Sequence, residues 1–279
     1  MGTCTFPKQN LDYNLNKMRI LITILICWPT LTWGQRYQLN SPRILADSIF
    51  FRQKAKVQLE FDLDSAVISY TTDGKIPGKN APVYNAPFTV DSSAVVRAKS
   101  EHQNFLTSPM TEKQLVKVSA MPDSFGLVPS PDTAYRGNGA ATLFDLQKGG
   151  RDLHDGHWLG FRTDSVVVTL QFGQATASRV LLLSTLFDPG AWIFPPRSVE
   201  VYGQSGDRPW MPMGRWMAKP DTPWKERPAK YDDYLRVVLR PVKVDRLRIR
   251  IIPYGPLPDG HPDAGAPAWL FIDEIAFQY

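Results

Sequence analysis

Histidines and cysteines, which often carry out catalysis or bind transition metals, are scarce in this sequence of 279 residues. There are four histidines, and neither a Gly-x-Ser-x-Gly nor a His-Glu-x-x-His motif accompanies them. His154 and His157, in His154-Asp155-Gly156-His157, could share a transition metal, but no third ligand is evident nearby, so hydrogen bonding within a loop is the alternative. The sequence therefore offers no recognisable catalytic centre.

Tryptophans are a second informative group, because an aromatic ring can lie against the apolar face of a sugar ring. Of the eight, Trp158 and Trp269 lie in strand-like motifs and are expected in the core. Three others fall in the proline-rich segment 208–228, which is long for an ordered loop and is therefore expected to be irregular. Trp192 lies in a loop, where its ring is either an exposed platform or part of the framework.

One segment near the C-terminus is basic. Arg246, Arg248 and Arg250 alternate with aliphatic residues, and a period of two places the arginines on one face of a strand. A solvated sheet face over a buried one accounts for this pattern. Anion or nucleic-acid binding is the alternative, although no aromatic residues alternate with the arginines to stack on bases.

Short strands must position these side chains, because 24 prolines and 19 glycines interrupt every long helical period. The run from Val67 to Pro77 predicts a strand that ends in a two-residue hairpin turn at Asp73-Gly74. After a polar hinge at 119–124, six strands are expected at 165–172, 179–187, 199–202, 234–239, 246–252 and 269–277. Adjacent strand residues point to opposite sides, so Asp273 and Glu274 are not expected to form a general acid/base pair on one face.

The N-terminal residues 1–34 have the layout of a secretory signal, in which Arg19 precedes a short apolar run and small residues surround a cleavage point before Gln35. The true start is then either Met1 or Met18. Both cysteines, Cys4 and Cys27, would be removed with this region. We expect an exported protein, at the periplasm, outer surface or outside the cell. A lipoprotein is disfavoured because Ile26 precedes Cys27.

Residues 37–118 resemble a known module in the order of their motifs. Tyr70-Thr71-Thr72-Asp73-Gly74 is followed by Tyr84, Pro87-Phe88 and Val96-Arg97-Ala98, which is similar to the C-terminal domain of chitobiases and β-hexosaminidases. The resemblance implies an immunoglobulin- or fibronectin-III-like β-sandwich over residues 35–118. It also implies that this part performs no chemistry.

Residues 121–279 resemble a coagulation-factor type C, or discoidin, domain. The motifs are Leu143-Phe144-Asp145, Asp155-Gly156-His157-Trp158-Leu159-Gly160-Phe161, Trp192-Ile193-Phe194-Pro195-Pro196 and the closing Phe271-Ile272-Asp273-Glu274-Ile275. The resemblance implies a discoidin-like jelly-roll β-sandwich over residues 122–279. The whole chain is thus expected to be all-β.

The discoidin resemblance also implies two sites. Sugar-binding members of this group commonly hold one structural Ca²⁺ at positions that match Asp145 and Glu274, for which turn capping and a surface ion pair are the alternative roles. The loop that contains Trp192 carries ligand contacts in similar domains, so Trp192, Asp188 and His154 are the candidate ligand-binding residues.

Together these features predict an exported, non-catalytic carbohydrate-binding or cell-surface accessory protein. A glycan or glycoprotein is the expected ligand and a glycosidase a candidate partner, while neither nucleic acid nor a membrane-spanning segment is expected. Two alternatives remain open, namely a purely structural partner that docks onto a glycosidase or envelope protein, and an unrecognised glycoside hydrolase.

Overall fold

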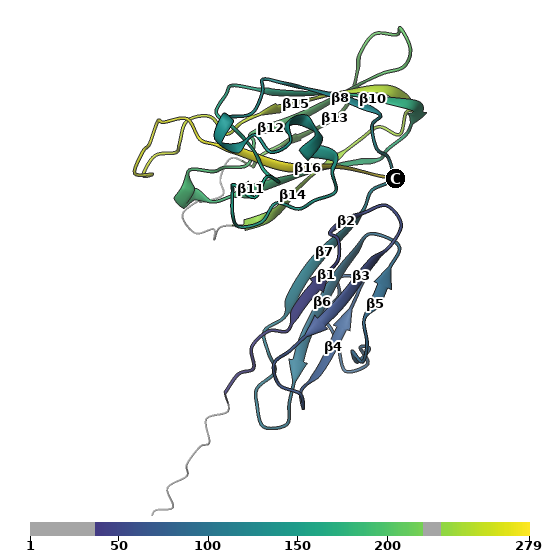
Figure 1. Cartoon of the computed structure of the whole chain (residues 1–279), viewed down its shortest axis with the longest axis vertical. Helices are drawn as coiled ribbons and strands as arrows, with labels where there is room; N and C mark the ends of the chain where they lie inside the picture. Colours follow the sequence, from purple (N-terminus) through teal and green to yellow (C-terminus); the bar gives the residue numbers. More distant parts are fainter. Residues whose placement is uncertain (1–36, 220–229) are drawn as a thin grey trace, which may run out of the picture. The chain divides into compact units, whose positions relative to one another are not determined.

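The structure is a computed structural model that describes residues 37–219 and 230–279, and nearly all of its regular elements are β-strands (Figure 1). The expected all-β fold class is confirmed. Residues 38–279 form the compact unit that carries these strands. Residues 1–34, on which the expectation of a secretory signal rests, lie outside the described part. The independent folding of 35–118 and 122–279 stays a prediction.

The first seven strands form two sheets. They are β1 (Arg43–Ala46), β2 (Phe50–Phe51), β3 (Ala55–Glu60), β4 (Val67–Thr71), β5 (Phe88–Val90), β6 (Ala94–Glu101) and β7 (Thr111–Lys117). One sheet has the order β1-β3-β5 and the other β2-β7-β6-β4. Every second side chain of β3 and β6 is buried, which produces an apolar core that includes Val57, Leu59, Val96 and Leu115.

The turn at Asp73-Gly74 differs from the predicted hairpin. Gly74 has the expected positive φ of 75°, but its amide donates to the Val95 carbonyl oxygen at 2.9 Å. Strand β4 pairs along its length with β6, whereas the residues after the turn reach β4 only at an isolated antiparallel bridge between Ser69 and Val83. Those residues contain three prolines, which lack the N–H groups that a second hairpin strand would need, at positions 77, 82 and 87.

The remaining strands form two further antiparallel sheets. They are β8 (Ser124–Val128), β9 (Leu159–Phe161), β10 (Val166–Thr176), β11 (Val180–Phe187), β12 (Ser198–Gln204), β13 (Met211–Met217), β14 (Lys230–Val238), β15 (Val244–Ile252) and β16 (Leu270–Gln278). The sheet orders are β13-β12-β15-β10-β8 and β14-β11-β16-β9. Short 3-10 helices occur at η1 (Thr133–Tyr135), η2 (Gly139–Phe144) and η3 (Pro189–Ala191).

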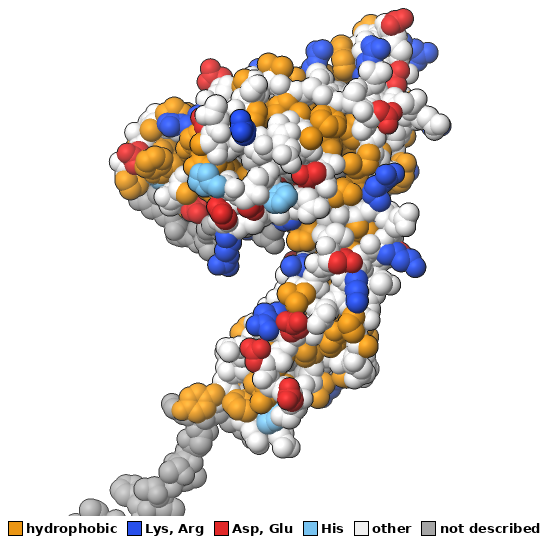
Figure 2. Space-filling view, in the orientation of Figure 1, with side chains coloured by type: hydrophobic (Ala, Val, Ile, Leu, Met, Phe, Trp, Pro, Cys, Tyr) orange, Lys and Arg blue, Asp and Glu red, His pale blue; other side chains and the backbone are white. Residues whose placement is uncertain are grey.

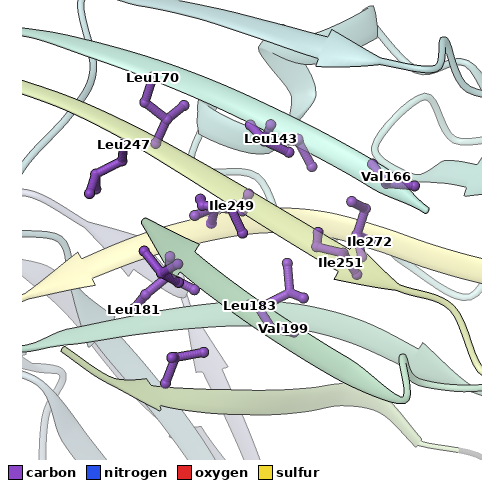
Figure 3. Packing of buried hydrophobic residues seen from close by; sticks show 14 of the residues in the cluster. Leu143, Val166, Leu170, Leu181, Leu183, Val199, Leu247, Ile249, Ile251 and Ile272 are labelled. Carbon is purple, nitrogen blue, oxygen red and sulfur yellow. The ribbon is translucent and has the colours of Figure 1, made fainter. Parts of the chain in front are cut away.

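The inner faces of these two sheets share one core. Figure 3 shows aliphatic side chains of β10, β12 and β15 together with those of β11 and β16, among them Leu170, Val199, Ile249, Leu183 and Ile272. Alternation in β10 and β15 buries one face of each strand and exposes the other. The sandwich therefore leaves the outer face of the five-stranded sheet, and the loops at its ends, to contact other molecules.

The six strands expected in this half are confirmed to within a few residues at most ends. Three strands were not predicted. β8 begins at the last residue of the expected hinge, β9 is three residues long, and β13 lies in the segment 208–228 that was expected to be irregular. The expectation was wrong for residues 211–217, because β13 pairs with β12 along its length despite Pro212, whereas residues 220–228 lie outside the described part. Pro212 is tolerated because β13 is an edge strand.

Candidate functional site

A β-bulge brings two carboxylates of the last strand to one loop. Ser184 and Thr185 are adjacent in β11 but pair with residues of β16 that are two apart, which leaves Asp273 as the extra residue. Both Asp273 and Glu274 accept hydrogen bonds from backbone amides of the loop 146–149. The expectation that these two side chains would be kept apart by strand alternation was therefore wrong.

Glu274 is completely buried. Its Oε2 accepts a hydrogen bond from the Leu146 amide at 2.9 Å, whereas Oε1 has no hydrogen-bond partner within the described residues. Burial, followed by the negative charges of Asp145 and Asp273, raises the pKa of Glu274 to about 10. Glu274 is thus a neutral acid at pH 7 unless a cation stabilises its charge.

Asp273 is buried as well, but it has a cationic partner. Its Oδ2 accepts hydrogen bonds from Lys148 Nζ at 2.7 Å and from the Gly149 amide at 2.8 Å. Within the described part of the chain, Oδ1 has no partner. Burial raises the pKa of Asp273, and Lys148 offsets part of that rise. Lys148 also lies 4.2 Å from the centroid of the Trp158 ring, which holds the ammonium in place.

Asp145 follows η2 and completes the group. Its Oδ1 accepts a hydrogen bond from the Gln147 amide at 2.8 Å, and its Oδ2 lies 3.9 Å from Nδ1 of His157. Burial raises the pKa of Asp145, the Gln147 amide and His157 lower it in part, and the charge of Asp273 raises it further. Asp145 and Glu274, which the resemblance paired, therefore lie close enough to influence each other's charge.

We refer to Asp145, Asp273 and Glu274 as the carboxylate cluster. Three acidic groups and one lysine leave an excess of negative charge, and two buried carboxylate oxygens lack partners. Hard oxygen ligands of this kind suit Ca²⁺. As placed, no three His, Cys, Asp or Glu side chains of the described residues are grouped to hold a metal ion. Calcium would thus require backbone carbonyls or a small movement of the loop, and it stays a proposal.

Trp192 lies on a turn that keeps its ring accessible. Asp188 precedes η3, and its Oδ1 accepts a hydrogen bond from the Ala191 amide at 3.3 Å. Trp192 then adopts a left-handed backbone conformation with φ of 63°, which is costly for any residue except glycine. Its side chain is 42% exposed, whereas Ile193 and Phe194 are buried. Ile193 and Phe194 are therefore part of the framework, whereas Trp192 is exposed.

His154 lies in a neighbouring aromatic group. Its ring is 5.0 Å from Tyr135, whose ring is 5.4 Å from Trp269. The Trp269 amide donates to the carbonyl oxygen of Trp192 at 2.8 Å, so the His154 and Trp192 loops meet through these residues. Figure 2 shows histidine side chains among acidic ones on one face of the molecule. The loops of Trp192 and His154 are thus linked through Trp269 and Tyr135.

Sequence reasoning missed Tyr135 and Arg162 at this end. The Arg162 guanidinium lies 5.2 Å from the Trp269 ring, next to a depression of about 250 Å³ that Arg162 and Asp164 line with Pro253, Pro256 and Pro267. Trp269 was expected in the core but is only half-buried. Trp158 is fully buried as expected. Neither Tyr135 nor Arg162 lies in a recognisable sequence motif, so only their contacts in the folded structure reveal them.

Comparisons with known proteins support the first part of the sequence resemblance. A family model of the chitobiase/beta-hexosaminidase C-terminal domain matches residues 47–112. No curated protein sequence matches the chain.

Solved structures with similar folds are distant in sequence. The C-terminal domain of a chitobiase from Bacteroides fragilis is 11% identical, with 56% of this chain and 94% of that chain covered and a TM-score of 0.34. A GH29 fucosidase from Ruminococcus gnavus in complex with fucose is 9% identical, with 56% of this chain and 25% of that chain covered and a TM-score of 0.35. A CBM32 module from Clostridium perfringens in complex with GalNAc-beta-1,3-galactose is 9% identical, with 56% of this chain and 94% of that chain covered and a TM-score of 0.37. This chain spans only a quarter of the fucosidase.

Proposed function

We propose that this chain is an exported, non-catalytic accessory protein that binds carbohydrate at the end of its C-terminal sandwich. The observation that carries the proposal is the half-exposed ring of Trp192, held in a strained left-handed conformation beside Asp188. Residues held in strained backbone conformations cluster at functional sites, where the surrounding structure maintains them despite their cost. The family match over residues 47–112, to a domain named for glycosidases, supports the same assignment.

The geometry suits a pyranose that stacks on Trp192. A sugar ring presents an apolar C–H face with hydroxyls around it, so an aromatic platform needs polar groups beside it. Asp188, fixed by its hydrogen bond to the Ala191 amide, can accept from sugar hydroxyls, and His154, on the neighbouring loop, can donate or accept. Arg162 adds a cationic group at the same end. The expected ligand is therefore a glycan or the glycan of a glycoprotein, and a glycosidase is the partner class that we propose.

Calcium forms the second part of the proposal. Asp145 and Glu274 would hold the ion, with Asp273 nearby, and a bound Ca²⁺ would supply the positive charge that this buried group lacks. The ion would tie the loop 145–149 to β16 and so act on stability and not on catalysis.

Two other functions compete with carbohydrate binding. A structural appendage that docks onto a glycosidase or envelope protein would use the same fold without Trp192 as a platform. A glycoside hydrolase would need two carboxylates in a cleft accessible to substrate. The carboxylate cluster does not meet that requirement, because Asp273 and Glu274 are fully buried.

Within the described residues, no helix is long and apolar enough to cross a membrane.

A glycan array with residues 35–279 tests the proposal. We expect binding to a subset of neutral glycans, a loss of at least about tenfold in affinity for Trp192→Ala, and retention by Trp192→Phe, which keeps an aromatic face. Removing the half-exposed ring should cost less stability than the roughly 3–5 kcal/mol typical of a buried tryptophan. If the wild type binds no glycan and Trp192→Ala unfolds the domain, the structural appendage is the better account. Turnover of chromogenic glycosides would favour the hydrolase.

A further inference from the structure

The outer face of the five-stranded sheet carries an unusual density of arginine. The expected alternation in β15 is confirmed, since Arg246, Arg248 and Arg250 are exposed and the residues between them are buried. Alternate residues of a strand are about 7 Å apart, so the three guanidinium groups form a row along the middle of the sheet. Core packing of Leu247, Ile249 and Ile251 turns these positions outward, but it does not require that all three be arginine.

The neighbouring strands do little to neutralise this row. Register pairs Arg250 with Glu200 of β12, and Glu200 is the one carboxylate among the described residues that the register places on this face. Its oxygens lie 3.5 Å from Nε of Arg215 and 3.8 Å from Nη1 of Arg250. Neither Arg246 nor Arg248 has an ion-pair partner in the described residues. Glu200 is thus the one acidic group that the register of the described strands places among these four arginines, while Asp245, next to Arg246 in the sequence, accepts a hydrogen bond from the Gly206 amide.

An aromatic ring stands beside the arginines. The Arg248 guanidinium lies 4.4 Å from the centroid of the half-buried Trp210 ring. Trp210 and Arg246 line a depression of about 190 Å³, whose floor and walls also include Ser124, Gly126, Thr169 and Gln171. This depression combines a cation, an amide, hydroxyls and an indole, which together match a sugar ring that bears an acidic substituent.

A second depression lies on the opposite side of β15. It has a volume of about 350 Å³ and is lined by Glu200, Tyr202, Pro212, Arg215 and Arg240. Neighbouring strands are about 4.8 Å apart, so an extended ligand that crosses from β10 over β15 to β12 spans roughly 10 Å between strand axes. A ligand of that length contacts both depressions and the arginine row, whereas a single sugar contacts only one of them.

We propose that this sheet face binds an acidic polysaccharide, a chain of sugars that carries carboxylate or sulfate groups at regular intervals. Planar guanidinium groups recognise both anions through paired hydrogen bonds. Nucleic acid fits less well, because one face of Trp210 is covered by Arg248 and the Tyr202 hydroxyl bonds to Glu200 at 3.2 Å, so no row of open aromatic faces is available to stack on bases. The sheet face is separate from the Trp192 end, so experiments can support or refute polysaccharide binding at the sheet face independently of sugar binding at Trp192.

Titration of residues 35–279 with defined polymers tests this assignment. We expect binding to polygalacturonate, which carries only carboxylates, and to dextran sulfate, which carries only sulfates, and none to uncharged dextran of similar length. Raising the salt from about 0.05 M to about 0.5 M should weaken binding at least about tenfold, because exposed charges are screened. The relative affinity for the two acidic polymers shows whether carboxylate or sulfate is preferred.

Paired charge changes locate the surface. Arg246→Gln/Arg248→Gln should reduce affinity at least about tenfold, whereas Arg179→Gln/Arg236→Gln, which removes the same charge from exposed positions outside this sheet, should change it less than about twofold. Trp210→Ala should weaken binding and Trp210→Phe should retain it, with thermal melts confirming that each variant is folded. Absence of binding to both acidic polymers, equal effects of the two double variants, or equal binding to dextran would overturn the proposal. Equally tight, arginine-dependent binding of oligo-dT would assign the surface to nucleic acid instead.

Discussion

The protonation of Glu274 gives a prediction whose size follows from the structure. In the metal-free protein Glu274 is completely buried and its pKa is raised from 4.5 to about 10. When the protein unfolds, this carboxyl returns to its ordinary pKa. Between pH 4.5 and pH 7 the unfolded state therefore releases a proton that the folded state retains, so raising the pH destabilises the folded state.

The magnitude comes from the pH interval. At ~1.36 kcal/mol per pH unit, the rise from pH 4.5 to pH 7 should cost the folded state about 3 kcal/mol through Glu274 alone. Because the folded pKa is raised, the contribution to stability is fully present below the ordinary pKa and is lost as the pH rises towards about 10. Asp145 and Asp273, whose pKa values are also raised, act in the same direction.

Glu274→Gln isolates this effect, because glutamine keeps the shape of the protonated acid and cannot ionise. Urea unfolding of the wild type and the variant, in the presence of a calcium chelator, gives the free energy of unfolding of each at pH 4.5 and pH 7. We expect the difference between wild type and variant to shift by about 3 kcal/mol in favour of the variant on going from the lower to the higher pH.

Other ionisable groups contribute to both proteins and cancel in this comparison. Asp145→Asn is a matched control at a less buried carboxylate, for which the same shift should be smaller. A difference between wild type and Glu274→Gln that is the same at both pH values would refute the reasoning, since it would mean that Glu274 is ionised in the folded protein without a metal.

Further predictions concern calcium, packing, strain and domain structure. Millimolar calcium should raise the melting temperature at pH 7, by the equivalent of about 2.7 kcal/mol at a hundredfold excess over Kd, and Asp145→Asn should abolish the rise; identical melts in calcium and chelator would exclude the site. Gly149→Ala should lower the free energy of unfolding by about 1–3 kcal/mol, because a Cβ there would clash with the buried Trp158 ring, whereas Gly78→Ala, where a Cβ would meet open space, should have little effect. Trp192→Gly should be more stable than Trp192→Ala by about 1 kcal/mol in urea unfolding, since only glycine relieves the positive φ, and equal stabilities would contradict the strain. Residues 122–279 alone should show a cooperative melt by circular dichroism, and limited proteolysis should cut at 119–124; a non-cooperative melt would move the boundary.

The strands could be predicted where one face is buried and the other exposed. In β15 the alternation of arginine with leucine and isoleucine gives the strand, its inward face and its outward face at once. β13 was missed because its residues, Met211 to Met217, include a proline, a glycine and three methionines, which suit either a buried or an exposed position. Edge strands with one partner tolerate such residues, so their sequences carry less of the alternating pattern.

The candidate sites depended on information of a different kind. Asp145 and Glu274 were paired by resemblance alone, since 128 positions separate the Glu274 carboxylate from its amide partner Leu146. Whether Trp192 is exposed could not be decided from its motif, because Ile193 and Phe194 beside it are buried. The left-handed backbone conformation of Trp192 turns the chain at that residue, so that Trp192 faces solvent while Ile193 and Phe194 face the core.

The bulge at Asp273 connects the proposed calcium site with the proposed sugar-binding end of the C-terminal sandwich. Without the extra residue, strand alternation would place only one of the two adjacent carboxylates over the loop 146–149. With it, both reach that loop, and the loop in turn contacts Trp158 through Lys148 and Gly149. Trp158 packs in the buried cluster with Ile193 and Phe271, next to Trp269 and Tyr135. A change of charge at the carboxylate cluster can therefore influence the packing that holds the Trp192 and His154 loops, so the proposed calcium ion, if bound, would act on the shape of the proposed sugar-binding end.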